Sequence, residues 1–283
     1  MLLVEVSGTR ILYSGDFRMH GRKAVLVDRL IEELAGSVDV LLMEGTNLGA
    51  DKPVIPESVL EQRFVDLAKS TPGQVYVQWS AQNIDRTVTL YRAAKRSERE
   101  LVIDLYAADV LARVAEGTGV PRPGADFKLL RVLILPSGKR LFARASRADV
   151  ADRMAVQPSA ISRRRLALRP AIIMLRDSML RDFERGGLGF TSKDAYAFSN
   201  WLGYLDKGDP QTAWHKAQDA GARTLHLHTS GHASSADLER FAQSIAPRWL
   251  VPVHGIAWDQ PGIALPPLRR LSDGQPWKIL NEE

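Results

Sequence analysis

Apolar and polar residues alternate with a period of two near the start of the chain. Residues 2–6 and 10–14 follow this pattern on either side of Ser7-Gly8-Thr9, which predicts a β-hairpin. An apolar run at residues 38–43, interrupted by Asp39, predicts a buried strand, and a helical period separates it from the hairpin. The first part of the chain is therefore expected to form a small sheet with a helix.

From residue 53 onward, short apolar runs typical of strands alternate with stretches of helical period. This alternation predicts a parallel sheet covered by helices. The arginine-rich stretch 140–154 is expected to be helical. The expected strands of this part are residues 74–79, 101–105, 130–135, 171–175 and 194–198.

Four of the six histidines fall between residues 223 and 258. A strand-like alternation there is broken by Gly231, a helical period covers residues 233–245, and a second strand ends just before His254. His232 and His254 are therefore expected at the ends of elements. In open α/β sheets the carboxyl ends of strands are where chemistry usually gathers.

Two carboxylates occupy similar positions. Asp16 follows the second strand of the hairpin, and Glu44 follows the run 38–43. Each has an ordinary structural interpretation, because Asp16 can serve as a turn carboxylate after Gly15 and Glu44 can cap the loop after its strand. Similarly, His254 can simply end a strand and His226 can be a strand residue without chemistry.

Composition narrows the chemistry. The chain of 283 residues has no cysteine, so a transition metal must be held by His, Asp and Glu. No run approaches the roughly 20 apolar residues of a membrane span, and the first residues lack a signal-peptide pattern, so a cytoplasmic protein without membrane contact is expected. The net charge is +5, and arginine outnumbers lysine between residues 122 and 185. That stretch suits either a solvated helical face or a nucleic-acid track.

Five short motifs occur in an order that resembles the β-CASP branch of the metallo-β-lactamase superfamily, which contains ribonuclease J and the mRNA 3′-end processing nucleases. They are S-G-D-F-R at 14–18, M-E-G-T-N at 43–47, N-I-D-R at 83–86 with V-I-D-L-Y at 102–106, H-T-S-G-H-A at 228–233 and V-P-V-H-G at 251–255. The resemblance implies an α/β fold, namely a partial metallo-β-lactamase αββα sandwich with an inserted parallel-sheet β-CASP domain. The sandwich would comprise residues 1–52 and 223–283, and the β-CASP domain residues 53–222.

The resemblance also implies a zinc-dependent phosphodiester hydrolase that acts on RNA, or on single-stranded DNA. Asp16 resembles the carboxylate that bridges two zinc ions, and His254 a ligand of the second ion. His232 resembles the acid that protonates the leaving oxygen, with Glu44 orienting it. A further set is expected to hold the scissile phosphate, and it consists of His228, Ser230 and Gly231.

One family motif is missing. No H-x-H-x-D-H sequence precedes Asp16, so only Asp16 and His254 remain as zinc ligands. We therefore expect an N-terminally truncated, impaired enzyme with weak zinc binding, whose partner is an N-terminal half or a second copy of the chain. The strands at residues 2–6 and 38–43 would expose apolar surface without that partner.

Two other hypotheses remain open. The chain can be a catalytically inactive β-CASP module that binds nucleic acid or a protein partner. It can also be a metallo-β-lactamase-fold hydrolase of another substrate, although the long insertion and the pair Glu44 and His232 fit the nucleic-acid branch better.

Overall fold

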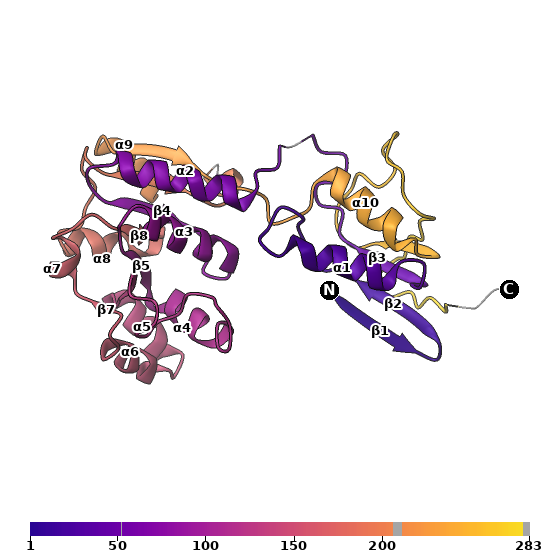
Figure 1. The fold of residues 1–283 in the computed structure, drawn as a ribbon, viewed down its shortest axis with the longest axis horizontal. Helices are drawn as coiled ribbons and strands as arrows, with labels where there is room; N and C mark the ends of the chain where they lie inside the picture. The colour runs from indigo at the N-terminus through magenta and orange to yellow at the C-terminus, as the bar shows by residue number, and fades with distance from the viewer. Residues whose placement is uncertain (52, 206–210, 280–283) are drawn as a thin grey trace. The chain divides into compact units, whose positions relative to one another are not determined.

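The computed structural model describes residues 1–51, 53–205 and 211–279, and the chain divides into two compact units (Figure 1). Unit 1 comprises Met1–Ile55 and Ser230–Glu283, and unit 2 comprises Pro56–Thr229. Both units combine a sheet with helices, so the predicted α/β class is confirmed.

Unit 1 contains a four-stranded sheet in the order β1-β2-β3-β11. β1 and β2 form the predicted antiparallel hairpin, and both residues of its loop, Ser7 and Gly8, have the positive φ that a tight hairpin turn requires. β2, β3 and β11 run parallel. The strands are β1 (Leu2–Val6), β2 (Thr9–Tyr13), β3 (Val40–Met43) and β11 (Trp249–Pro252).

Two helices, α1 (Ala24–Leu34) and α10 (Ser235–Ile245), cover one face of this sheet. Alternate strand residues such as Leu12, Leu41 and Leu250 point to that face and join the helices in one apolar core. The helical periods in the sequence therefore mark the surfaces that the helices bury against the sheet.

The other face of the hairpin is apolar but exposed. Leu2 lies opposite Tyr13, and these side chains are 59% and 42% exposed. Val4 and Val6 belong to the same face and are exposed as well. The expectation of exposed apolar surface is thus confirmed for β1. It is wrong for β3, because that strand lies between β2 and β11 and Val40, Leu41 and Met43 are buried there.

Unit 2 is built on a seven-stranded sheet in which every pair of neighbours is parallel, as the alternation predicts. Its order is β10-β9-β4-β8-β5-β6-β7. The strands are β4 (Val75–Gln78), β5 (Leu101–Asp104), β6 (Leu130–Leu133), β7 (Ala160–Ile161), β8 (Ile172–Met174), β9 (Ala195–Phe198) and β10 (Arg223–His226).

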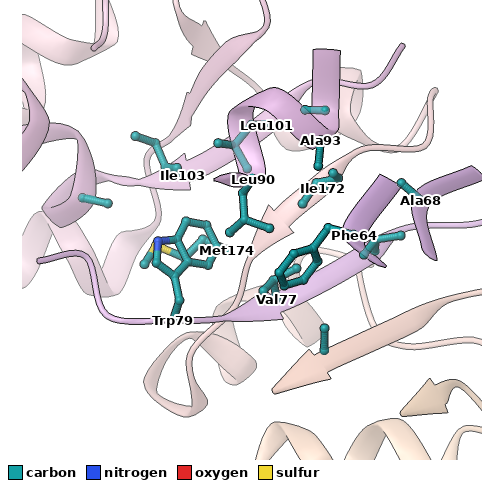
Figure 2. Packing of buried hydrophobic residues seen from close by; sticks show 14 of the residues in the cluster. Phe64, Ala68, Val77, Trp79, Leu90, Ala93, Leu101, Ile103, Ile172 and Met174 are labelled. Atoms are coloured by element: carbon teal, nitrogen blue, oxygen red, sulfur yellow. The ribbon is translucent and has the colours of Figure 1, made fainter. Parts of the chain in front are cut away.

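Helices cover both faces of this sheet. On one face, α2 (Glu57–Ser70), α3 (Ile84–Arg96) and α4 (Leu105–Val114) pack on the strands, and Figure 2 shows Phe64 and Leu90 among strand residues of this core. On the other face, Phe183 of α8 (Leu180–Arg185) and Ala217 of α9 (Ala213–Asp219) pack against side chains such as Tyr76 and Tyr196.

The stretch expected to be one helix at 140–154 forms two, because Ser146 adopts a positive φ of 57° between them. The sequence pattern does not predict the short strand β7 or the short helix α7 (Arg163–Leu166). The remaining elements are α5 (Pro136–Arg144), α6 (Ala148–Ala155), α7 (Arg163–Leu166) and the 3₁₀ turns η1 (Asp177–Met179) and η2 (Leu202–Tyr204).

The unit boundary differs from the expected one at residues 222 and 223. β10 forms a parallel ladder with β9, so its backbone hydrogen bonds are made inside unit 2. The boundary consequently falls between Thr229 and Ser230.

Across the described residues, no helix combines the length and the apolar composition that a membrane crossing requires.

A buried ion pair ties several elements of unit 2 together. Arg86 of α3 and Glu57 of α2 are 0% and 1% exposed and lie 3.1 Å apart. Arg86 also donates to the carbonyl oxygens of Ser199 and Leu227, and Thr89 donates to Glu57 at 2.7 Å. This network joins two helices to the chain beyond β9 and β10.

We predict that Arg86→Met lowers the free energy of unfolding of unit 2 by about 3–5 kcal/mol, because the Glu57 carboxylate stays buried without its cation. The measurement is urea unfolding, with hydrogen-exchange mass spectrometry to assign the transition to unit 2. Arg153→Ala is the control, since the Arg153 and Asp149 side chains are 66% and 60% exposed and the change should stay within about 0.5 kcal/mol. Equal effects of the two substitutions would contradict the prediction.

Candidate functional site

Three strand ends meet at one edge of the unit 1 sheet. β2, β3 and β11 are neighbouring parallel strands, and the chain continues from them to Asp16, Glu44 and His254 respectively. The carboxyl ends of parallel strands lie at the same edge, so these side chains gather there. His232 lies in the turn before α10 and reaches the same edge through Glu44.

Glu44 is the buried centre of this group. Its side chain is 2% exposed, its Oε1 accepts the N–H of Phe17 at 2.9 Å, and its Oε2 lies 2.6 Å from Nδ1 of His232. Burial is the largest influence on the Glu44 pKa and raises it, but the hydrogen bonds from His232 and Phe17 outweigh burial and lower the pKa overall. The hydrogen bond to Glu44 raises the pKa of His232, against the opposing effect of burial.

The turn that carries His232 is clamped by residues that the sequence analysis did not single out. Asn47 donates from Nδ2 to Oγ of Ser230 at 3.2 Å and to the carbonyl of Ala233 at 3.0 Å. Nε2 of His20 lies 2.8 Å from the carbonyl oxygen of Ser230, whose hydroxyl accepts the N–H of His232. Asn47 closes the M-E-G-T-N motif, and that position was the available signal for its role.

A contact between two glycines brings the loops after β3 and β11 together. A Cβ on Gly255 would lie 2.2 Å from the carbonyl oxygen of Gly45, and φ of Gly255 is +93°. A Cβ on Gly45 would lie 2.4 Å from the ring of Trp258, which also donates from Nε1 to the carbonyl of His254 at 3.0 Å. Only glycine permits this approach, which places Glu44 and His254 beside the contact.

The geometry at this edge suits one zinc ion. Oδ1 of Asp16 lies 3.4 Å from Nδ1 of His254, and two ligands each about 2.1 Å from a tetrahedral zinc are roughly 3.4 Å apart. Ligand atoms of Asp16, Glu44 and His232 also lie within 4.8 Å of one another. Both Glu44 oxygens already accept hydrogen bonds, and among the described residues this group does not include His254, so Asp16 and His254 are the pair placed to share an ion.

This set does not fit a pair of zinc ions. Asp16 and His254 provide fewer ligands than the roughly three that even a single catalytic zinc takes from protein. The side chains of Asp16 and His254 are 55% and 59% exposed, so the ligand pair is open to solvent.

The three residues expected to hold the phosphate belong to different units. His228 lies in unit 2, where Nδ1 is 3.2 Å from the carbonyl oxygen of Ser199, while Ser230 and Gly231 lie in unit 1. Burial chiefly, and then the charge of Arg86, lowers the pKa of His228 from 6.5 to about 4. The space beside Gly231 is open. The shared phosphate-binding role stays a prediction.

The chain is similar to known proteins both in one segment and over its whole length. Residues 222–256 match the family of the Zn-dependent metallo-hydrolase RNA specificity domain (RMMBL). The chain is 22% identical to ribonuclease J of Mycoplasma genitalium over 306 aligned positions, which cover 100% of the chain and 49% of that protein. The chain is therefore a relative of the β-CASP metallo-β-lactamases.

The fold of this β-CASP relative also occurs in a crystal structure of a protein of unknown function from Enterococcus faecalis V583. The TM-score is 0.64 at 20% identity, and the match covers 96% of the chain and 59% of that protein. The chain thus spans about half the length of the ribonuclease J that it matches.

We predict that Glu44→Gln lowers the pKa of His232, because the neutral amide removes the carboxylate that stabilises the imidazolium. The measurement is an NMR titration of the histidine Cε1–H signals in metal-free protein. Asp28→Asn is the control, since Asp28 pairs with Arg240 and should leave the His232 pKa unchanged. An unchanged His232 pKa in Glu44→Gln would show that the pair is not coupled.

His228 should make the stability of unit 2 depend on pH. Its folded pKa of about 4 lies below the ordinary 6.5, so between these values the unfolded chain binds a proton that the folded chain does not. The free energy of unfolding should therefore fall as pH drops from 6.5 towards 4, by at most about 1.4 kcal/mol per pH unit. His228→Gln should reduce this slope in urea unfolding across that range, and an unchanged slope would contradict the prediction.

Proposed function

We propose that this chain forms the Asp16 and His254 side of a zinc-dependent site that hydrolyses RNA phosphodiesters. The observation that carries the proposal is the buried Glu44 carboxylate bonded to His232 at the edge where Asp16 and His254 lie 3.4 Å apart. The similarity to a protein named ribonuclease J and the match to an RNA specificity domain support RNA as the substrate.

In the proposed reaction, His232 is the general acid and Glu44 orients it. Hydrogen bonding to Glu44 keeps Nδ1 of His232 occupied and raises its pKa, so a proton is available on the ring for the leaving oxygen. Asp16 and His254 would hold zinc, which supplies a water of lowered pKa and neutralises charge on the phosphate.

The shortage of ligands implies low activity for the chain by itself. A dinuclear site needs more ligands than Asp16 and His254 provide. We propose that a partner polypeptide, either an N-terminal half or a second copy, supplies the others. The exposed apolar face that Leu2, Val4 and Val6 form on β1 offers this partner a surface.

A second candidate function is binding of RNA without cleavage. The open, incomplete ligand set favours it, and the arginine-rich stretch of unit 2 provides positive charge for phosphates. This candidate predicts RNA binding that weakens steeply with salt and needs no metal.

The test is zinc affinity together with cleavage of 5′-phosphorylated RNA by the purified chain. Zinc should bind weakly, at no more than about one ion per chain. Asp16→Asn and His254→Ala should each weaken zinc binding at least about tenfold, because each substitution removes one protein ligand of the ion. His226→Gln is the control, because His226 is exposed and bonds to the carbonyl of Asn200 in unit 2.

The outcomes separate the two candidates. Slow, zinc-dependent cleavage that His254→Ala abolishes supports the hydrolase. Salt-sensitive RNA binding without any cleavage supports the binding module. Rapid cleavage by the chain alone would contradict the incomplete site, and zinc binding that survives both ligand substitutions would contradict the assignment of Asp16 and His254.

A further inference from the structure

At the C-terminal end of β8 in unit 2 the chain leaves to the opposite face of the sheet from its neighbours. Its neighbours β4 and β5 lead into α3 and α4 on one face of the sheet, whereas β8 leads into α8 on the other. Parallel sheets open a crevice beyond the strand ends where neighbouring connections leave to opposite faces. A cavity of about 310 Å³ lies there, among residues that follow β5, β6 and β8.

One face of helix α5 lines this cavity. Ser137, Arg140, Leu141 and Arg144 follow the spacing i, i+3, i+4 and i+7, which places them on one side of a helix. Arg140 and Arg144 are one turn apart, so their charges repel each other. An anion between them would relieve that repulsion.

Arg176, which follows β8, contributes a third guanidinium to the lining. It pairs with Oδ2 of Asp104 and lies over the ring of Tyr106 at 5.5 Å. The other oxygen of Asp104 accepts the N–H of Ala107 at 2.8 Å, so Asp104 is itself fixed. Nε of Arg176 is buried and has no hydrogen-bond partner within the described part of the chain. The guanidinium of Arg176 is thus held in place beside the cavity by Asp104 and Tyr106.

Several arginines of the basic stretch are balanced by carboxylates, but two that line the cavity are not. Arg131, Arg147 and Arg153 each form an ion pair with a carboxylate. Among the described residues neither Arg140 nor Arg144 forms such an ion pair. Burial raises the pKa of Asp182, but hydrogen bonds from Ser137 and then the charges of Arg140 and Arg163 lower it overall. Asp182 is already bonded to the N–H of Ser137 at 2.7 Å. Arg140 and Arg144 are therefore available to an anionic ligand.

We propose that this cavity binds a nucleoside monophosphate. Arg140 and Arg144 would hold the phosphate, Arg176 would add a third positive charge, and apolar lining such as Leu135, Leu141 and Met179 would contact the nucleoside. The volume is at the lower end of the range for small-molecule sites, which suits one mononucleotide better than a strand. The inference rests on the proposed function, because hydrolysis of RNA releases nucleotides of this kind.

The experiment is isothermal titration calorimetry of the whole metal-free chain with AMP, UMP and inorganic phosphate. One mononucleotide should bind per chain, more tightly than phosphate alone. Arg144→Ala and Arg140→Ala should each weaken binding at least about tenfold. Arg153→Ala, on the neighbouring helix and paired with Asp149, should change it less than about twofold. Circular dichroism checks that each variant is folded, and Leu141→Glu, at an exposed position, provides an independent loss of binding.

Three results would overturn the proposal. The first is the absence of mononucleotide binding at about 10 mM, since a weaker affinity would not be specific. The second is mononucleotide binding that Arg144→Ala leaves unchanged. The third is Arg144-dependent binding of a 5′-phosphorylated oligonucleotide together with no binding of any mononucleotide. Asp16→Asn separates this proposal from the proposed function. That variant should lose zinc and retain the mononucleotide, and loss of both would place the nucleotide in unit 1 instead.

Discussion

The buried carboxylate of Glu44 is the interaction on which the candidate site depends. A buried charge is tolerated only where hydrogen bonds replace its water, and Glu44 obtains them from the backbone of Phe17 and the ring of His232. Those two partners lie in separate segments of the chain. The need to satisfy one carboxylate therefore joins the loop after β2, the end of β3 and the turn before α10, and it sets the protonation behaviour of His232 at the same time.

Much of this arrangement could be predicted from local patterns. Alternation and apolar runs locate the strands, and the parallel order of β2, β3 and β11 brings Asp16, Glu44 and His254 to one edge because strand ends carry them. The clamp from Asn47 to Ser230 could not be predicted, since it joins residues 183 positions apart. The break at Ser146 was missed for a different reason. A left-handed residue within an otherwise helical pattern leaves no periodic signal.

The basic stretch of unit 2 shows why counting charges is a weak guide to binding. Several of its arginines form ion pairs with carboxylates of the same unit, such as Arg131 with Glu100 and Arg147 with Asp109. The charge of these arginines is therefore already neutralised. What distinguishes Arg140 and Arg144 is their place on one helical face above a cavity. The relevant quantity is the charge left after internal pairing, together with a concave surface that can exclude water from a ligand.

The match to the RNA specificity domain has a practical consequence, because residues 222–256 include β10, α10 and β11. β10 hydrogen-bonds to β9 in one sheet, whereas β11 hydrogen-bonds to β3 in another. The matched segment is thus a signature shared by two folding units and cannot be treated as a portable module. An expression fragment or chimaera cut at its ends would separate β10 from its ladder and leave its backbone groups unsatisfied, so dissection of this protein should follow the sheets.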